Sequence, residues 1–357
     1  MMFKKELVFK DGNSFNNMPI LKIIESETPL KGPSDDIKHL YFQTQAKIDH
    51  VPTQRWYYYR NLANDYEFEP RKGCINRAFY KIWEILQVFQ HLLPSDTEFT
   101  CHLAEAPGSF VQVVQSKNSG LKSIAVSKAS EPNKDIPTFS DVILKQNGVV
   151  CLYSDLCKKT ELLNFIIKAI QFSERKKFMF ITADGGIDEG AAFEKKEELH
   201  YSLILNEIIA ALLLQRIGGH FVIKFFDCFN MFTIDLMYLL YLHYEKFEIY
   251  KPITSRPTNS ERYIICSGFK GCQMTSTNLL NLVETPITNN SRLNTATPLK
   301  FTNYISSVNN DICKRQIISI NNVLKMINER HVYDYKKRRS FKRKKYQQWK
   351  EKYKCNV

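Results

Sequence analysis

Apolar residues along this chain occur in short runs that alternate with amphipathic segments, which is the pattern of a sheet covered by helices. Helical spacing predicts helices at 162–170 and 232–244, and a long helix from about 197 to 217 that Gly218-Gly219 would end. Seven apolar runs predict strands, centred near residues 100, 124, 149, 178, 221, 247 and 263. Helices separate all strands except the last two, so we predict an α/β fold, a doubly wound seven-stranded sheet, mostly parallel, with a closing antiparallel hairpin.

The first strand runs into a turn of small residues. In the stretch Phe99–Phe110 the strand stops at Glu105-Ala-Pro-Gly108, and a helical run from Val111 to Gln115 follows. Unpaired backbone N–H groups at such a helix start can hold a carboxylate or a ribose hydroxyl, as in nucleotide-binding doubly wound sheets. Tight turns with Pro and Gly also occur without any ligand, so the turn alone leaves an ordinary structural role open.

Charged residues interrupt the predicted core elements at a few places. Asp184 follows the apolar strand 177–182, and such a position faces the crevice where ligands bind. Lys224 lies in the middle of strand 220–226, where a buried lysine is costly unless it is paired, which favours a functional role. Lys81 points away from the apolar stripe of a helix that begins at Arg77, which by itself is typical of a solvated lysine. The stripe consists of Ile75, Phe79, Ile82, Leu86 and Phe89.

Composition narrows the class of protein. The chain has 357 residues, of which 44% are hydrophobic, enough to bury a large core. No run approaches the roughly 18 apolar residues of a membrane span, and the N-terminus lacks an apolar signal core. The nine cysteines are scattered singly, without a C-x-x-C pair. We therefore expect a soluble, intracellular protein with reduced thiols and no metal site.

The positive charge is concentrated at the C-terminal end. Of the net charge of +13, the segment 336–354 contributes +10, from eleven Lys and Arg and one acid. This density predicts that residues 331–357 are a disordered basic tail that binds an acidic polymer, with a solubility or localisation tail as the alternative. Aromatic rings within the tail could stack on bases. They are Tyr335, Phe341, Tyr346, Trp349 and Tyr353.

The remaining segments carry weaker patterns. Residues 1–70 show no clean period and are interpreted as an N-terminal extension, in which Arg55-Trp-Tyr-Tyr-Tyr-Arg60 either contacts RNA or its cap or packs onto the body. Residues 272–330 form a C-terminal extension. Its part 272–310 is rich in Asn, Thr and Ser and is expected to be loop-like, whereas 312–327 predicts one amphipathic helix.

Four segments, in order, resemble those of the FtsJ-like (RrmJ-type) RNA ribose 2′-O-methyltransferases. Arg77–Ile85 is similar to the family's S-R-A-x-x-K-L-x-E-I segment and Ala106–Phe110 to its A-P-G-G-W/F cofactor turn. Gly219–Lys224 is similar to its G-x-x-V-x-K strand, and Ser255–Tyr263 to its S-R-x-x-S-x-E-x-Y segment. The resemblance covers about 75–270 and implies a Rossmann-like, S-adenosylmethionine-dependent methyltransferase domain at 71–271.

The resemblance also implies a catalytic tetrad, formed by Lys81, Asp184, Lys224 and Glu261. The implied reaction is methyl transfer to a ribose 2′-hydroxyl of RNA, which requires alignment of the reactants and removal of a proton. Lys224 is the candidate base, and we expect burial and the like charge of Lys81 to lower its pKa. Asp184 and Glu261 would orient the two ammonium groups, and no metal is required.

The implied cofactor is S-adenosyl-L-methionine. His102 and Ala104 stand where the family has Asp and Gly, so we expect Glu105 to supply the acidic contact to the methionine amino group. Asp155 fits the family's adenine-contacting position, whereas no acid is present near Ser127-Lys128 for the cofactor ribose. The candidate cofactor-binding residues are Glu105, Ala106, Pro107, Gly108, Ser109, Phe110, Asp155 and Asp184.

RNA is the implied substrate, and the first nucleotides of capped mRNA are the predicted target. The Glu-Ala-Pro-Gly form resembles the cap-methylating branch of large cytoplasmic DNA viruses, and the richness in Asn, Ile, Lys, Phe and Tyr suits an AT-rich genome. This implies cytoplasmic location, in a virion or viral factory, with capping or transcription proteins as partners and no membrane. Two alternatives stay open: 2′-O-methylation of ribosomal or transfer RNA, and a non-catalytic RNA-binding scaffold, which would predict loss of part of the tetrad.

Overall fold

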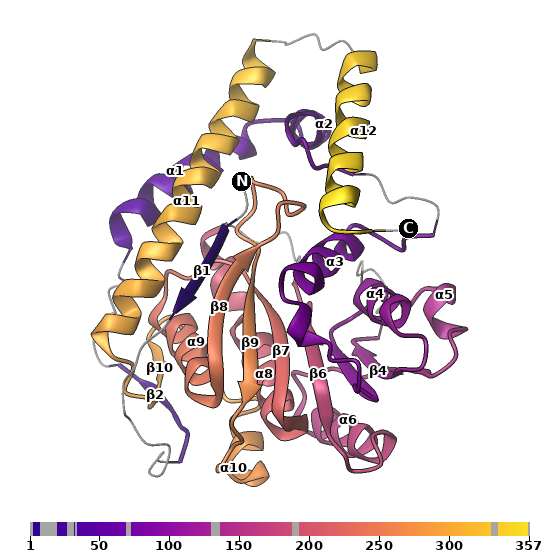
Figure 1. Cartoon of the computed structure of the whole chain (residues 1–357). Helices are drawn as coiled ribbons and strands as arrows, with labels where there is room; N and C mark the ends of the chain where they lie inside the picture. Colours follow the sequence, from indigo (N-terminus) through magenta and orange to yellow (C-terminus); the bar gives the residue numbers. More distant parts are fainter. Residues whose placement is uncertain are drawn as a thin grey trace.

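The chain folds into one central sheet with helices on both faces (Figure 1). The apolar strand runs of the sequence become the sheet, because strands buried on both faces need apolar side chains on both sides. The computed structural model describes residues 3–7, 20–26, 32, 34–68, 73–129, 136–187, 193–329 and 335–355.

The sheet has the strand order β1-β8-β9-β7-β6-β3-β4-β5. Strands β3 to β7 are parallel, β9 is antiparallel to both β7 and β8, and all seven predicted strands are present. The fold prediction is therefore confirmed, with the addition of β1, which pairs antiparallel with β8 at the sheet edge. The strands are β1 (Phe3–Leu7), β3 (Phe99–Leu103), β4 (Lys122–Ser127), β5 (Val149–Tyr153), β6 (Phe178–Ala183), β7 (Gln215–Phe225), β8 (Tyr244–Lys251) and β9 (Arg262–Phe269).

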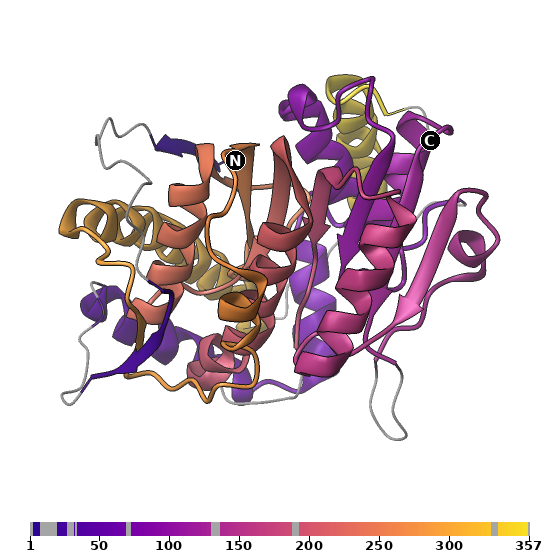
Figure 2. The ribbon, with the colours of Figure 1, turned by 90° about the horizontal axis from the view of Figure 1, so that it is seen from below.

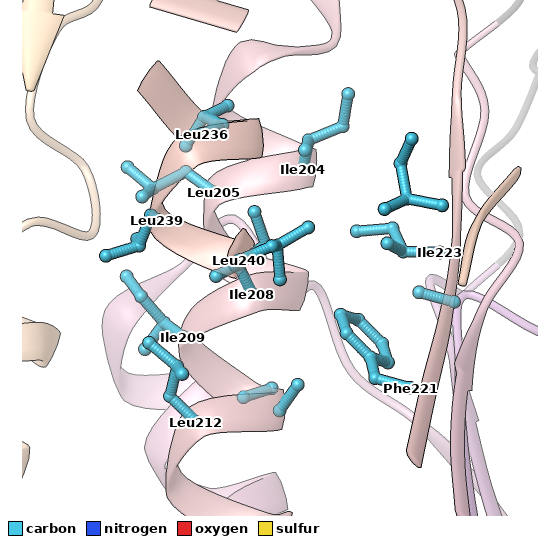
Figure 3. Packing of buried hydrophobic residues seen from close by; sticks show 14 of the residues in the cluster. Ile204, Leu205, Ile208, Ile209, Leu212, Phe221, Ile223, Leu236, Leu239 and Leu240 are labelled. Carbon is cyan, nitrogen blue, oxygen red and sulfur yellow. The ribbon is translucent and has the colours of Figure 1, made fainter. Parts of the chain in front are cut away.

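Helices cover the two faces of the sheet as separate layers (Figure 2). On one face, side chains of α8 and α9 point toward Phe221 and Ile223 of β7 (Figure 3). On the other face, α3 and α4 pack in a second cluster around Phe110 and Tyr263. The helices flanking the sheet are α3 (Ala78–Val88), α4 (Ser109–Lys117), α5 (Asp141–Leu144), α6 (Lys159–Phe172), α7 (Lys196–Leu199), α8 (Tyr201–Leu214) and α9 (Met231–His243), with short 3-10 turns η2 (Gln90–Leu92) and η3 (Phe193–Lys195).

The predicted long helix 197–217 begins where expected, but its continuity and its C-terminal end are wrong. It is divided into α7 and α8, and α8 ends at Leu214, where β7 begins. Gly218 and Gly219 therefore lie inside β7, where the pairing with β6 shifts register. Gly218 has φ +79°, and a Cβ on Gly219 would lie 2.8 Å from the carbonyl oxygen of Arg216. The two glycines thus allow the register shift within β7, and they do not cap the helix.

The segment between the sheet and the basic tail contains more structure than expected. Helix α11 (Leu299–Asn328) begins well before the predicted residue 312, because Phe301, Ile305 and Val308 extend its buried stripe between exposed polar residues. Residues 272–298 also hold α10 (Ser276–Leu280) and β10 (Ser291–Leu293), which pairs with β2 (Ile23–Glu25).

The N-terminal extension forms two helices, α1 (Asp35–Asp49) and α2 (Thr53–Ala63), which pack on α11. Trp56 of the aromatic cluster is buried against Ile320 and Val323, whereas Tyr57 and Tyr58 are about half exposed. The packing alternative thus holds for Trp56, and the two tyrosines remain accessible.

The basic tail is a helix over its described part, and the prediction of disorder is wrong there. Helix α12 (Tyr335–Lys352) places Tyr346, Trp349 and Tyr353 on one side, and all three are buried against α3. The reason is their i, i+3, i+7 spacing, which gives an otherwise cationic helix a narrow apolar stripe. These three rings are therefore unable to stack on bases. Phe341 is 40% exposed, and residues 331–334 of the predicted tail lie outside the described residues.

A search of the described helices for one long and apolar enough to cross a membrane finds none.

Candidate active site

The carboxyl ends of the parallel strands bring the predicted tetrad together. Asp184 directly follows β6, Lys224 is the penultimate residue of β7, and Glu261 directly precedes β9, its antiparallel neighbour. Lys81 reaches the same place from α3, which covers this edge of the sheet. Residues separated by up to 180 positions thus meet at the edge where doubly wound sheets bind ligands.

The tetrad forms two close ion pairs that interact with each other. Lys81 Nζ lies 2.7 Å from Glu261 Oε2, and Lys224 Nζ lies 3.1 Å from Asp184 Oδ1. Lys224 also donates a hydrogen bond of 2.6 Å to the backbone carbonyl of Asp184, and Tyr263 OH donates one of 3.0 Å to the Asp184 carboxylate. The two lysine side chains are 16% and 11% exposed, so both cations are largely withdrawn from water yet paired.

The expectation of a lowered pKa for Lys224 is wrong for the protein without ligands. Burial alone favours the neutral amine, but the charges of Asp184 and Glu261 outweigh it and raise the pKa of Lys224 above its ordinary value. Burial likewise raises the pKa of Glu261, and the ammonium groups of Lys81 and Lys224 lower it to about 2. The site is therefore an alternating arrangement of charges in which Lys224 carries its proton.

Space beside Lys224 is kept open by the residues after β6. A side chain at Gly186 would place its Cβ 3.4 Å from Lys224 Nζ. At Gly185 a Cβ would overlap the carboxylate of Glu207, a buried residue of α8. The two glycines therefore let the backbone approach the amine of Lys224 and the carboxylate of Glu207 closely.

The turn after β3 places a buried carboxylate at the start of α4. Glu105 Oε1 accepts the backbone N–H groups of Phe110 and Val111 at 2.7 and 3.1 Å, and Gly108 adopts φ +111° at the N-cap. The other oxygen, Oε2, has no hydrogen-bond partner among the described residues. Burial, then the charge of Asp184, raises the pKa of Glu105 well above its usual range. A ligand with an ammonium group would both satisfy the free oxygen and stabilise the ionised form, so the turn fits the predicted cofactor.

The other residues of the turn are mainly structural contacts. Ser109 Oγ donates to Asn76, the Pro107 carbonyl accepts from Ser140, and the Phe110 ring is buried 6.1 Å from that of Tyr263. Ala106 packs beside Ile143 in the small cluster between α4, α5 and β4. These contacts fix the shape of the turn rather than present polar groups to a ligand.

Asp155 lies after β5, away from the tetrad. Its Oδ1 accepts the N–H of Cys157 at 2.9 Å, and its Oδ2 lies 3.3 Å from Lys128 Nζ. Lys128 thus lies where the sequence lacks an acid for the cofactor ribose. Its ammonium group pairs with Asp155, the residue predicted to contact the adenine. His102 is buried between the hydroxyls of Thr100 and Thr182, where it replaces an acid by neutral hydrogen bonds.

Two buried acids that sequence reasoning missed support the site. Glu207 lies in α8, and burial raises its pKa to about 8 beside Lys224 and Asp184. Glu84 lies one turn after Lys81 and accepts hydrogen bonds from Tyr250 OH at 2.6 Å and Ile253 N at 2.8 Å. A single acid inside an otherwise apolar helical run was the available signal for Glu207.

Lys251 holds the loop that delivers Glu261. Its buried ammonium donates to the backbone carbonyls of Asn259 and Glu261 at 2.8 and 2.6 Å, and burial lowers its pKa to about 7. Ser255 Oγ adds a 3.0 Å hydrogen bond to Glu261 Oε1. The position of Glu261 is therefore fixed from three sides, by Lys81, Lys251 and Ser255.

The sequence of the chain is similar to those of known methyltransferases. Residues 74–269 match the family model of the FtsJ-like methyltransferases. The chain is 30% identical over 271 residues to cap-specific mRNA (nucleoside-2′-O-)-methyltransferase 1 of Homo sapiens, which covers 70% of this chain and 32% of the relative. The same-named protein of Dictyostelium discoideum is 30% identical over 309 residues, which covers 77% and 41%. The chain thus spans about a third of the length of the human relative.

Among solved structures, the chain is similar to a putative ribosomal RNA methyltransferase from Plasmodium falciparum, with a TM-score of 0.44 and 19% identity. That similarity covers 55% of this chain and 99% of the other.

Proposed function

Since the chain belongs to the FtsJ-like methyltransferase family, a family of RNA 2′-O-ribose methyltransferases, we propose that it methylates a ribose 2′-hydroxyl in the first nucleotides of capped mRNA. The observation that supports this most strongly is the convergence of Lys81, Asp184, Lys224 and Glu261, paired at 2.7 and 3.1 Å, at the carboxyl edge of the sheet. A scaffold without catalysis has no need for two largely buried lysines, each paired with a carboxylate, because such ion pairs are costly to desolvate.

S-adenosylmethionine is the proposed cofactor, and it supplies a methyl group on a sulfonium, an activated electrophile. The free Oε2 of Glu105 would accept a hydrogen bond from its amino group, whereas the backbone N–H groups of Phe110 and Val111 at the α4 N-terminus are already bound by Glu105 Oε1. Asp155 would contact the adenine, and its carboxylate would then bind both the adenine and Lys128, or the adenine in place of Lys128.

Lys224 is the proposed base for the 2′-hydroxyl proton. It accepts a proton only as the neutral amine, and the surrounding carboxylates disfavour that form in the protein without ligands. Positive charge brought into the crevice with the cofactor opposes the carboxylates and lowers the pKa of Lys224. Lys81 and Glu261 would hold the ribose hydroxyl in line with the methyl group of the cofactor. Their ion pair keeps both largely buried side chains in place.

The cap as target rests on the names of the relatives and on the resemblance of the Glu105–Gly108 turn to capping enzymes of large cytoplasmic DNA viruses. A cytoplasmic viral capping enzyme is therefore part of the proposal, with capping or transcription proteins as its partners. Methylation of ribosomal or transfer RNA is the alternative target.

The test is transfer of labelled methyl to capped and uncapped RNAs of matched sequence, followed by nucleoside analysis. We expect 2′-O-methylation of a cap-proximal nucleotide, little product on uncapped RNA, and none on the matching DNA because DNA lacks the nucleophile. Equal methylation of both RNAs would favour the ribosomal or transfer RNA alternative. Methyl incorporation into DNA, or none into any RNA, would contradict the proposed reaction.

A further inference from the structure

Helix α12 is fixed to the helix that carries Lys81. The rings of Trp349 and Tyr80 lie 5.4 Å apart, and those of Tyr346 and Phe68 lie 5.1 Å apart. Trp83 Nε1 donates a 2.9 Å hydrogen bond to the carbonyl of Tyr353 at the end of α12. Because Tyr80 and Trp83 flank Lys81 along α3, α12 has a defined position relative to the catalytic residues.

The sides of α12 that do not contact α3 are strongly cationic. Glu351 is the one acid in the described part of the helix. A rigid helix with this charge presents cations at fixed spacing, which a disordered tail does not. The exposed cations are Lys337, Arg339, Arg343, Lys344 and Lys352.

The positive charge continues from α12 toward the tetrad. Arg338 donates to the carbonyl of Leu62 and pairs with Asp65 at 2.8 Å, and Lys342 donates to the carbonyl of Asn61, so both cations lie at the end of α2. Arg60 lies in the last turn of α2, and its guanidinium carbon is 4.6 Å from the ring centre of Tyr57, which is about half exposed.

The row of cations that starts on α12 and passes the end of α2 continues to the loop that holds Glu261. Glu67 pairs with Arg77 at 3.1 Å and with Arg256 at 2.8 Å, and Arg77 also donates to the carbonyl of Thr254. Thr254 precedes Ser255, which holds Glu261. Among the described residues, cations outnumber acids along this row, which holds Arg60, Arg77, Arg256, Arg338 and Lys342 against Asp65, Glu67 and Glu261.

This crowding also shows in the titration of Arg60. Burial, followed by the charge of Arg256, lowers the pKa of Arg60 to about 10. Anions placed along this row would relieve this repulsion.

We propose that α12, the end of α2 and the two arginines paired with Glu67, Arg77 and Arg256, form a binding surface for the phosphate backbone of single-stranded RNA, which leads the strand to the tetrad. The inference rests on the proposed function, because continuity with a site that acts on ribose is what identifies RNA as the polyanion. The exposed rings of Tyr57 and Phe341 lie beside Arg60 and Arg338 and can stack on bases.

The test compares two triple variants with the same loss of charge. The first is Arg339→Gln, Arg343→Gln, Lys344→Gln on the exposed sides of α12. The control is Lys122→Gln, Arg216→Gln, Lys246→Gln, at exposed positions where β4, β7 and β8 begin, on the opposite edge of the sheet. The affinity for a 20-nucleotide RNA is measured at several salt concentrations, with cofactor affinity and thermal unfolding as checks on folding.

We expect the slope of log affinity against log salt to fall by about 0.7 for each lost phosphate contact, up to roughly 2 for the α12 variant. The control should keep the slope of the unmodified protein. If both variants keep the slope of the unmodified protein, or if the slope falls by the same amount in both, the inference is overturned. Partner docking or localisation would then remain as the role of α12.

The methylation assay separates this inference from the proposed function. With the α12 variant, the KM for a capped 20-nucleotide RNA should rise at least several-fold more than with the control variant. If the unmodified protein methylates no RNA, the proposed function fails. If it methylates RNA and the two variants have the same KM, only the α12 surface fails.

Discussion

Removal of the Trp349 side chain tests whether α12 belongs to the folded core. The indole is 2% exposed and lies among Phe68, Tyr80 and Tyr353, so Trp349→Ala would leave a large cavity between α12 and α3. Substitutions of this kind cost about 3–5 kcal/mol of unfolding free energy. The lost contact of 3.4 Å from Nε1 to the Glu84 carboxylate adds little, because Tyr250 and Ile253 still donate to Glu84.

A loss of this size is a large fraction of the stability of a typical protein, about 5–15 kcal/mol. We expect a lower urea midpoint and a melting temperature lower by roughly 6–10 °C, from about 2 °C per kcal/mol in a large domain. The matched control is Phe341→Ala on the same helix, where the ring is 40% exposed and the loss should stay below about 1 kcal/mol. If Trp349→Ala is no less stable than Phe341→Ala, α12 does not pack as described and the basic tail is an independent arm.

Three further predictions concern the site. Glu105→Gln should weaken cofactor binding by about 1.5–3 kcal/mol, roughly 10- to 150-fold, because the free oxygen loses its charge; unchanged affinity in calorimetry would refute this contact. Burial lowers the pKa of His102 to about 3 in the folded state. As the pH falls below about 6.5, this histidine therefore binds a proton in the unfolded state but not in the folded state, and the unfolded state is favoured. About 2 kcal/mol of stability should be lost between pH 6.5 and 5, and His102→Gln should lose less in urea unfolding at the two pH values. Since the pKa of Lys224 is raised in the protein without ligands, log kcat/KM for RNA, measured at a cofactor concentration well below its KM, should rise with pH beyond 8, and a plateau below pH 7 would argue against this base.

The sheet could be predicted because its signals are local, since apolar runs mark β3 to β9. Charges beside or within these runs singled out Asp184 and Lys224, whereas the resemblance to the FtsJ-like family was needed to identify Lys81 and Glu261 as members of the tetrad. The order of the strands then brings these residues to one edge of the sheet, whatever the details of the loops.

The pKa of Lys224 and the state of α12 could not be predicted in the same way. The pKa depends on the 3.1 Å distance to Asp184 and on the charge of Glu261, both of which are set by tertiary structure. In α12 the charge density is local, but the stability of the helix comes from a stripe that needs Tyr80 of α3 as its partner.

The boundaries that were wrong share one cause. The apolar run that ends α8 continues into β7 without a change in composition, so Gly218-Gly219 looked like a helix end although the chain is already a strand there. In α11, the Asn, Thr and Ser residues before 312 conceal a buried stripe that starts at Phe301. In both places tertiary packing decides, and composition does not.

The most direct test of the central claim is the single-turnover rate of methyl transfer by Lys224→Ala, with cofactor affinity measured by calorimetry on the same sample. The control is Lys246→Ala, an exposed lysine at the opposite edge of the sheet. If Lys224 removes the 2′-hydroxyl proton, its loss should lower the rate by about 10²–10⁴-fold while cofactor affinity stays within a few-fold, and the control should match the unmodified protein. A rate for Lys224→Ala comparable to that of the control would contradict the assignment of Lys224 as the base.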